Sequence, residues 1–309
     1  MENHIEKLSR ILAASGWSQE DLSDQLGVSF VTLNKWVNGK AEPRAAAKDK
    51  IDQVAAEVLG SDDVDVAELI KVKKQAMAQK FSVRRLVMNR EVLDRITVNL
   101  TYHSNATEGS TMTEGDVAAV IFDNKVLKNR TAVEQREAIN HQTALNFLID
   151  ELQSQGKGFV MTPDLIRVTH LRLMNSVISN AGEYRNHSAR IRGAHVPLAN
   201  FIKIPELIKL WCGEVNEETA DPIALLAKSH AEFERIHPFS DGNGRTGRLL
   251  LFIKALHLGL VPPVIKKERR MAYYRYLELC QLQDLSDLLE MFIAEAIIET
   301  GEELKTVGI

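Results

Sequence analysis

The sequence has few of the features that mark secreted, disulfide-rich or membrane proteins. Its 309 residues include only two cysteines, Cys212 and Cys280, and their spacing fits neither a metal site nor a redox motif. The N-terminus has no signal-peptide pattern. The longest apolar run, 249–260, is interrupted by Lys254 and His257 and is too short to cross a bilayer. We therefore expect two reduced thiols in a soluble, cytoplasmic protein without a membrane partner.

A strong excess of charge is missing as well. The formal net charge is −4, whereas proteins that bind nucleic acid broadly are basic, so any DNA contact must be local. Hydrophobic residues make up 45% and charged residues 26% of the chain, which suits a packed core. The length allows two domains.

Strand patterns are almost absent. Apolar residues recur at spacings of three and four along most segments, so the sequence predicts an all-α fold. The exception is 189–197, where Ile191 and Val196 flank Gly193 and Ala194. This pattern predicts a small β-hairpin on a helical body.

Residues 1–60 show a helix, glycine turn, helix pattern. One helix ends at Gly16, a second runs from Ser18 to Gly27, and a third ends at Gly39. In this third helix we expect three side chains to face inward, Val31, Leu33 and Trp36. Together with the trailing Gly39 and Pro43, the segment resembles the Cro/phage-repressor type of helix-turn-helix domain.

By that resemblance, the helix after Gly27 would enter the major groove of DNA. Phe30 and Val31 stand at its start, however, and neither can donate a hydrogen bond to a base edge, although an apolar group can touch a thymine methyl. Residues 1–50 carry seven basic and seven acidic side chains, so attraction to phosphates should be weak. The domain is predicted to bind either DNA or a protein partner, or to fix a dimer. The candidate DNA contacts are Ser29, Thr32, Asn34 and Lys35.

The remaining chain divides into a charged connector, 61–95, with a solvated face, and one helical domain, 96–300. Within that domain, residues spaced three and four apart share one face of a predicted helix, and the last of them, His237, should point into the following loop. These residues are Ile223, Leu226, His230, Phe233 and His237. We expect His230 to be a core residue and 249–260 to form a helix buried on all sides.

The stretch HPFSDGNGRTGR, 237–248, gathers groups that suit a polyphosphate. Gly242 and Gly244 let backbone N–H groups turn inward at the start of a helix, where its dipole favours an anion. Arg245 and Arg248 lie three residues apart and can face the same anion. Each feature is weak alone, but their combination predicts an anion site.

Three further side chains complete the predicted chemistry. Asp241 is a hard oxygen ligand for Mg²⁺, and Asn243 offers an amide to a phosphate oxygen. His237 can accept a proton near neutral pH. Phe239 is expected to bury its ring as an anchor.

The stretch matches the Fic family motif HPFx(D/E)GNGRxxR at every fixed position, and the similarity extends over 96–300. The resemblance implies transfer of AMP from ATP to a hydroxyl of a target protein. It implies that His237 takes the hydroxyl proton and Asp241 holds Mg²⁺. Phosphate binding would fall to Gly242, Asn243, Gly244, Arg245 and Arg248. The hairpin at 191–197 resembles the family's flap, which aligns the target segment; a simple surface hairpin is the alternative.

Two other segments resemble Fic features. Tyr274, Leu277 and Gln281 share one helix face and look like the adenine-side wall, although an aromatic stripe at this spacing is also typical of a core. SNATEG, 104–109, matches the inhibitory pattern (S/T)xxxE(G/N), formed here by Ser104, Glu108 and Gly109. By resemblance Glu108 would pair with Arg248 and displace the ATP γ-phosphate. In some relatives the same glutamate orients water for removal of AMP.

The sequence therefore predicts an all-α Fic domain with a small β-hairpin flap behind a helix-turn-helix domain. The predicted function is AMP transfer that uses ATP and Mg²⁺. The alternative is a DNA-binding transcriptional regulator whose Fic domain senses nucleotide. A homodimer is expected only by analogy with the family.

Overall fold

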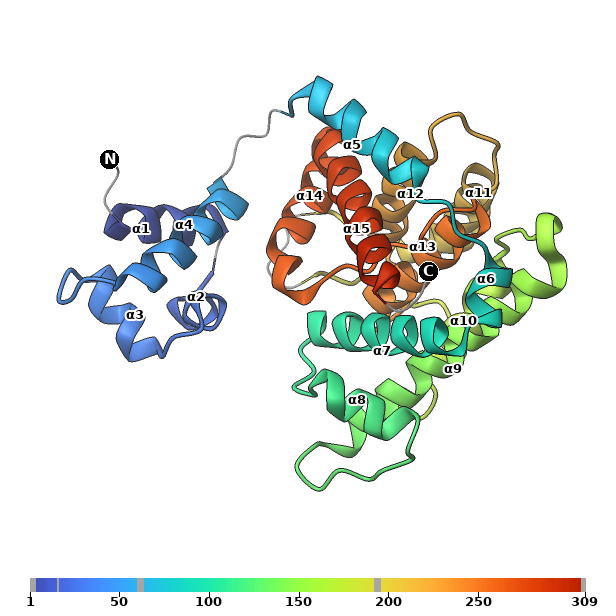
Figure 1. Cartoon of the computed structure of the whole chain (residues 1–309), viewed down its shortest axis with the longest axis horizontal. Helices are drawn as coiled ribbons and strands as arrows, with labels where there is room; N and C mark the ends of the chain where they lie inside the picture. Colours follow the sequence, from blue (N-terminus) through green and yellow to red (C-terminus); the bar gives the residue numbers. More distant parts are fainter. Residues whose placement is uncertain (1–3, 16, 60–63, 192–195, 307–309) are drawn as a thin grey trace. The chain divides into compact units, whose positions relative to one another are not determined.

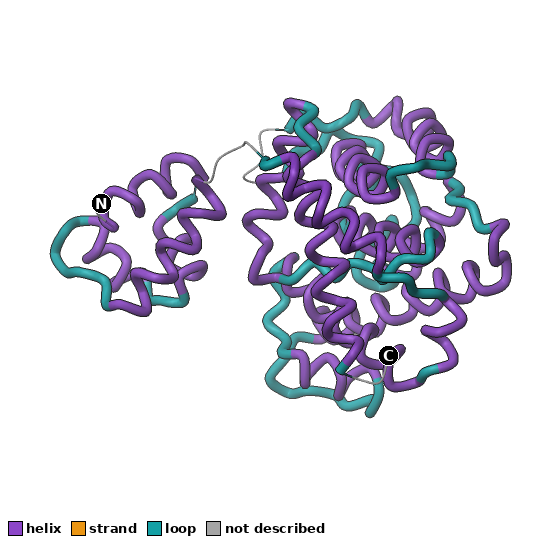
Figure 2. Tube along the Cα trace, turned by 45° about the horizontal axis from the view of Figure 1, so that its top comes forward, coloured by secondary structure: helices purple, strands orange, loops and turns teal. Residues whose placement is uncertain are grey.

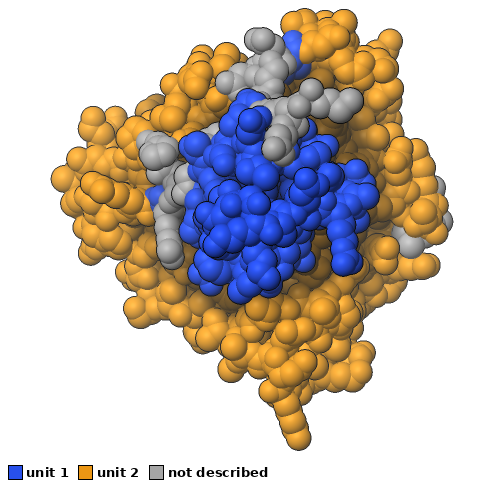
Figure 3. Space-filling model, turned by 90° about the vertical axis from the view of Figure 1, so that its left-hand side faces the viewer, with its two compact units in different colours: residues 1–64, 191–195 blue, residues 65–190, 196–309 orange. Residues whose placement is uncertain are grey.

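The computed structural model describes residues 4–15, 17–59, 64–191 and 196–306. The chain divides into two compact units, 1–64 with 191–195 and 65–190 with 196–309 (Figure 3). None of the helices in the described residues combines the length and the apolar character that crossing a bilayer requires. Figure 2 shows helices and loops without strands in the described chain, which confirms the all-α prediction; a single isolated β-bridge joins Lys80 to Leu260.

The first unit consists of α1 (His4–Ser15), α2 (Gln19–Leu26), α3 (Phe30–Val37) and α4 (Ala45–Leu59) (Figure 1). Ser18 and Ser29 cap the starts of α2 and α3, and Gly27 ends α2 in the left-handed conformation (φ 67°). A separate core forms between these helices, with Leu8, Ile11, Leu22, Leu33 and Ile51 fully buried.

One inward-facing prediction in this unit is wrong. Leu33 and Trp36 are buried, but the side chain of Val31 is 61% exposed. In a helix of 3.6 residues per turn, a residue two positions before Leu33 lies on the opposite face. Val31 therefore stands with Phe30, which is 48% exposed, on the outer face of α3.

The second unit is a larger helical body. Its helices are α5 (Val66–Ala78), α6 (Val83–Met88), α7 (Arg90–Thr107), α8 (Glu114–Ile121), α9 (Ala132–Gln155), α10 (Pro163–Leu173), α11 (Ile204–Val215), α12 (Pro222–Ile236), α13 (Asn243–His257), α14 (Arg270–Gln283) and α15 (Asp287–Lys305). Helix α13 lies among α7, α9, α10 and α12. Every residue from Leu249 to Leu256 is buried, but α13 ends at His257 and residues 257–259 are half-buried, so the predicted all-round burial of 249–260 holds only for its first part.

The segment expected as a connector contributes to this body. Helix α5 packs along α15 and buries Leu69, Val72 and Ala76. Ile70 on the other side is 63% exposed, so one face of the helix is solvated as expected and the other belongs to the core.

The predicted β-hairpin is not seen in the described residues. Residues 189–191 and 196–197 have no strand pairing, and the centre of the predicted turn, 192–195, lies outside the described residues.

Candidate active site

The loop between α12 and α13 carries most of the predicted site residues. His237 caps the end of α12 with a left-handed backbone (φ 50°, ψ 62°), a conformation that histidine tolerates better than most residues. Gly242 caps the start of α13, also left-handed (φ 75°). The loop therefore turns sharply at both ends and places an imidazole beside a helix N-terminus.

The side chain of Asn243 makes its hydrogen bonds within the loop. Its amide is buried, and its side chain exchanges two hydrogen bonds of 2.8 Å with the backbone N–H and C=O of Phe239. These bonds close the loop from inside. The amide therefore stabilises the loop, and its contact with a phosphate oxygen stays a prediction.

A histidine that the sequence analysis did not single out supports the loop from outside. His170 stacks on Phe239 with ring centroids 3.6 Å apart and planes at 2°, and Phe239 is fully buried, as predicted for an anchor. The Gly182 N–H donates to Nδ1 of His170, which leaves Nε2 to donate to the carbonyl of Asp241, each at 2.9 Å. Burial lowers the pKa of His170 to about 4, so the ring is a neutral hydrogen-bonding group.

The imidazole of His237 is held in its neutral form. Its Nδ1 lies 3.3 Å from the carbonyl oxygen of Glu234. The tautomer that donates there has its lone pair on Nε2. Burial lowers the pKa of His237, and the positive charge of Arg185 acts in the same direction. The carbonyl of Glu234 and the charges of Glu108 and Asp241 oppose the shift without cancelling it.

Glycine leaves room for neighbouring side chains at two motif positions. A Cβ at Gly242 would lie 2.6 Å from the sulfur of Met174, and one at Gly244 would overlap the carboxylate of Glu108. No side chain caps α13, so its first N–H groups have no side-chain acceptor. The glycines thus keep the positive end of the helix open.

Each motif arginine pairs with a carboxylate from another helix. Nη1 of Arg245 donates to Oε1 of Glu137 at 2.5 Å, and its Nη2 lies 3.7 Å from Asp241. Nη2 of Arg248 donates to Oε1 of Glu108 at 2.6 Å. The structure therefore contains the pair expected for Glu108 and a second pair, through Glu137, that the sequence analysis missed.

Ser104 orients the guanidinium of Arg248, which pairs with Glu108. The Ser104 hydroxyl and carbonyl both accept from the guanidinium at 3.0 Å. Burial favours the neutral form of Glu108, but the charge and hydrogen bond of Arg248 outweigh it and lower the pKa of Glu108. The arginine side chain is 2% exposed and that of Glu108 is 34% exposed. Water therefore reaches the carboxylate of Glu108, whereas the guanidinium of Arg248 is enclosed.

Comparison with known proteins agrees with these motifs. Residues 160–253 match the model of the Fic/DOC family, and residues 8–47 match a helix-turn-helix model.

Residues 160–253 are a Fic/DOC domain.

Two curated relatives are named as protein adenylyltransferases. Protein adenylyltransferase fic-1 of Caenorhabditis briggsae is 31% identical over 186 residues, which are 60% of this chain and 36% of the relative. Protein adenylyltransferase Fic of Nematostella vectensis is 27% identical over 259 residues, or 83% of this chain and 58% of the relative. The chain thus spans about a third to three-fifths of the length of these two relatives.

Solved structures show the same fold. Fic-1 (residues 134–508) of C. elegans superposes with a TM-score of 0.65 at 24% identity and covers 94% of this chain and 86% of that one. A Fic domain containing signaling protein of Bacteroides thetaiotaomicron gives a TM-score of 0.63 at 23% identity and covers 77% and 95%.

Six buried polar atoms of the second unit have no hydrogen-bond partner among the described residues, and two of them belong to the motif arginines. They are Arg245 Nε, Arg248 Nη1, Asn105 Oδ1, His141 Nε2, Tyr184 Oη and Glu234 Oε1. Burial lowers the pKa of His141 to about 3, and the charges of Arg248 and Arg245 add to this. A buried polar group without a partner costs about 1–3 kcal/mol. The unpartnered arginine donors therefore fit a phosphate ligand.

The predicted adenine wall is divided between surface and core. Tyr274 is 41% exposed and its hydroxyl donates to the carbonyl of Thr107 at 3.4 Å, next to Glu108. Leu277 is buried in the core. The amide of Gln281 donates to the carbonyl of Ala231 at 2.8 Å. Tyr274 is therefore the member of this set with surface available to a ligand beside Glu108.

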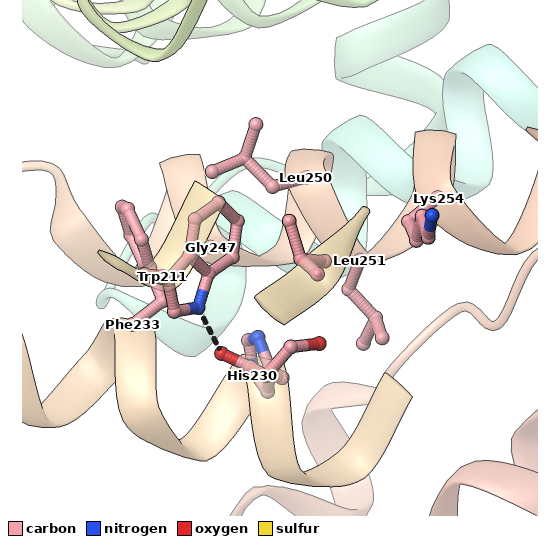
Figure 4. Close-up of a pocket in the computed structure, with 9 residues that line it drawn as sticks. Trp211, His230, Phe233, Gly247, Leu250, Leu251 and Lys254 are labelled. Atoms are coloured by element: carbon pink, nitrogen blue, oxygen red, sulfur yellow. Dashed lines mark hydrogen bonds between the residues drawn. The ribbon is translucent and has the colours of Figure 1, made fainter. Parts of the chain in front are cut away.

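The cavity between α11, α12 and α13 is too small for a nucleotide. The cavity in Figure 4 has a volume of about 10 Å³ and is lined by residues such as Trp211, His230 and Leu251, so it holds one water at most. His230 is a core residue, as predicted: it is buried, and its Nε2 lies 2.8 Å from the hydroxyl of Tyr273.

Three of the four candidate DNA contacts already have partners within the first unit. Ser29 Oγ accepts from the Thr32 backbone N–H at 3.2 Å and lies 2.8 Å from the Thr32 hydroxyl. The Asn34 amide donates to Gln19 at 2.9 Å. Lys35 is exposed. The exposed residues of α3 thus include two apolar side chains, Phe30 and Val31, as well as Lys35.

Proposed function

We propose that this protein transfers AMP from ATP to a hydroxyl group of a Tyr, Ser or Thr side chain in a target protein. The observation that carries the proposal is the 237–248 loop, which places a neutral imidazole, an open helix N-terminus and two buried arginines together. The names of the curated relatives support the same activity.

In the proposed reaction, Nε2 of His237 takes the proton of the target hydroxyl. The hydroxyl oxygen then bonds to the α-phosphorus of ATP, the bond to the bridging oxygen breaks, and pyrophosphate leaves. Arg245, Arg248 and the first N–H groups of α13 hold the phosphates and stabilise the developing charge.

Magnesium fits the exposed carboxylate of Asp241. In the described part of the chain no group of three or more His, Cys, Asp or Glu is placed to hold a metal, and Mg²⁺ in phosphoryl-transfer sites commonly rests on one or two carboxylates plus substrate phosphates. When bound, the ion would neutralise phosphate charge. Asp241 is 61% exposed, and His170 fixes its backbone.

Glu108 acts as a brake in this proposal. Its carboxylate occupies Arg248 and the space beside Gly244, where the γ-phosphate would bind. An exposed ion pair would contribute only about 0–1 kcal/mol, but Arg248 is enclosed and Ser104 orients it, so the pair can compete with ATP.

The first experiment compares incorporation of label from α-labelled ATP with Mg²⁺ and lysate. The variants are the parent, Glu108→Gly, Glu108→Gln, and Glu108→Gly with His237→Ala. We expect label on protein in both single variants, little in the parent and none in the double variant. Glu108→Gln keeps the shape of the side chain and removes its charge. If Glu108→Gly binds ATP but labels no better than the parent, the brake is disproved.

Removal of AMP by the same site is a second proposal. The charge of Glu108 reaches His237 and raises its pKa, although burial outweighs this effect, and its exposed carboxylate can orient a water. Release of AMP from a pre-modified substrate by the parent, and its loss in Glu108→Gly, is the expected result.

A regulator that binds DNA is the alternative. The helix-turn-helix match and the exposed outer face of α3 favour a macromolecular partner for the first unit. A gel shift at low salt on DNA upstream of the gene tests this, and no shift would leave a protein partner.

A further inference from the structure

Arg185 is an unusually connected buried residue between α10 and α11. It is 2% exposed. Its Nε donates to the carbonyl of His237 at 2.7 Å, its Nη1 to that of His187 at 2.7 Å, and its Nη2 to that of Ala199 at 2.6 Å. Its backbone N–H also donates to the carbonyl of Pro238 at 2.9 Å.

No carboxylate pairs with this guanidinium among the described residues. Burial alone lowers the pKa of Arg185, whereas Arg235 nearby is bidentate to Glu232. A buried cation is costly unless strong hydrogen bonds compensate it. Here the compensation comes from backbone carbonyls of three separate segments, so the planar guanidinium fork sets their relative position.

The most demanding of those segments contains His237. Its backbone is left-handed, a conformation that costs a non-glycine residue free energy and persists only when its surroundings impose it. Arg185 donates to the carbonyl of His237 through its Nε and to the carbonyl of Pro238 through its backbone N–H. Its charge also lies close enough to help keep the imidazole neutral.

We propose that Arg185 is a positioning residue for His237, tying its backbone to the chain at His187 and Ala199 so that Nε2 points at the target hydroxyl. The inference rests on the proposed transfer activity. A displaced imidazole would slow the chemical step but leave ATP binding intact, because none of the phosphate-binding groups contacts Arg185.

The test uses the full chain carrying Glu108→Gly, with Arg185→Ala, Arg185→Lys or Arg167→Ala added. Arg167 is a control at a more exposed position: its side chain is 47% exposed, and its Nε donates to the carbonyl of Gly182 at 3.0 Å but does not touch His237. We expect Arg185→Ala to lower kcat by about a hundredfold, with ATP affinity unchanged, and guanidinium at a non-denaturing concentration to restore part of it. The ascending limb of the pH profile should move to higher pH because a cation is lost. Arg185→Lys should lower kcat without moving that limb.

Unchanged kcat in Arg185→Ala, or a loss that matches the loss of ATP binding and resists guanidinium, would overturn the proposal. If Arg185→Ala does not fold, Arg185→Lys decides: a kcat equal to that of the control rejects the positioning role. Absence of label in the chain that carries Glu108→Gly alone would instead reject the proposed function. In that case the pKa of His237, measured by NMR, still tests the contact between Arg185 and His237. Arg185→Ala removes the positive charge and should raise the pKa of His237, whereas Arg185→Lys keeps the charge and should not. Equal pKa values in the two variants would reject the contact.

Discussion

Glu234 is a buried acid of the Fic domain that has no role in the proposed reaction. Its side chain is buried, its Oε1 has no partner, and a Cβ on Gly247 would overlap that oxygen. Burial raises the pKa of Glu234 to about 7; the charge of Arg248 opposes this rise and that of Glu108 adds to it. The carboxyl is therefore protonated in the folded state over a range where it is ionised in the unfolded chain.

We predict that Glu234→Gln alters the pH dependence of stability. Because the folded pKa is raised, the contribution of Glu234 to stability is largest below pH 4.5, falls as pH rises to about 7, and then levels off. At about 1.4 kcal/mol per pKa unit, the loss is about 3 kcal/mol. Glutamine cannot ionise, so relative to the parent the variant should gain stability between pH 5 and pH 8.

Thermal unfolding at both pH values measures this effect. Glu232→Gln is the control, because Glu232 is partly exposed and paired with Arg235. Equal shifts of Tm at both pH values in Glu234→Gln would show that Glu234 does not titrate in this range.

At the scale of elements, Lys73 holds α5 to the rest of the second unit. Its Nζ donates to Asp221, at the start of α12, and to Glu290 in α15, both at 2.5 Å. Burial lowers the pKa of Lys73, but the hydrogen bonds and charges of the two acids outweigh it and raise the pKa overall. A short helix with one apolar face is thus anchored by an ion pair as well as by packing.

We predict that Lys73→Met lowers the free energy of unfolding by about 3 kcal/mol, because it leaves the buried Glu290 without its cation. Adding Glu290→Met should recover part of the loss. Lys71→Met is the control, since Lys71 is exposed and pairs with Glu68 one turn away; such pairs contribute only about 0.3–0.5 kcal/mol. Urea titration measures all three, and equal losses for Lys73→Met and Lys71→Met would contradict the anchor.

At the scale of the whole molecule, the two units have separate cores. The core of the first unit is built from α1 to α4, and the main core of the second from α5 onward, with no residue in common. The proposed site residues of the transfer reaction all belong to the second unit.

We predict that residues 65–309 with Glu108→Gly label themselves from α-labelled ATP at a rate within about twofold of the full chain, since no group of the proposed site is removed. Initial rates under matched concentrations provide the measurement. A fragment that folds by circular dichroism but labels tenfold more slowly would show that the first unit contributes to catalysis.

Local sequence patterns determined much of this protein. Helix periodicity, serine caps and glycine stops specified the helix-turn-helix domain, and the spacing of 237–248 specified a loop with a base, an open helix start and two arginines. These features depend on residues a few positions apart, so they can be read along the chain. The error at Val31 arose where position within the helix turn, and not apolar character, decided exposure.

Tertiary structure alone decided which groups complete the site. Glu137 meets Arg245 across 108 positions, and Arg185 meets His237 across 52. A lone glutamate or arginine carries no local mark of such a partner, because the contact depends on how helices far apart in the chain pack. The buried amide of Asn243 likewise bonds to the backbone of Phe239, a contact that the sequence analysis did not predict. The sequence specified the chemical groups, and packing determined which of them face the ligand and which hold the others in place.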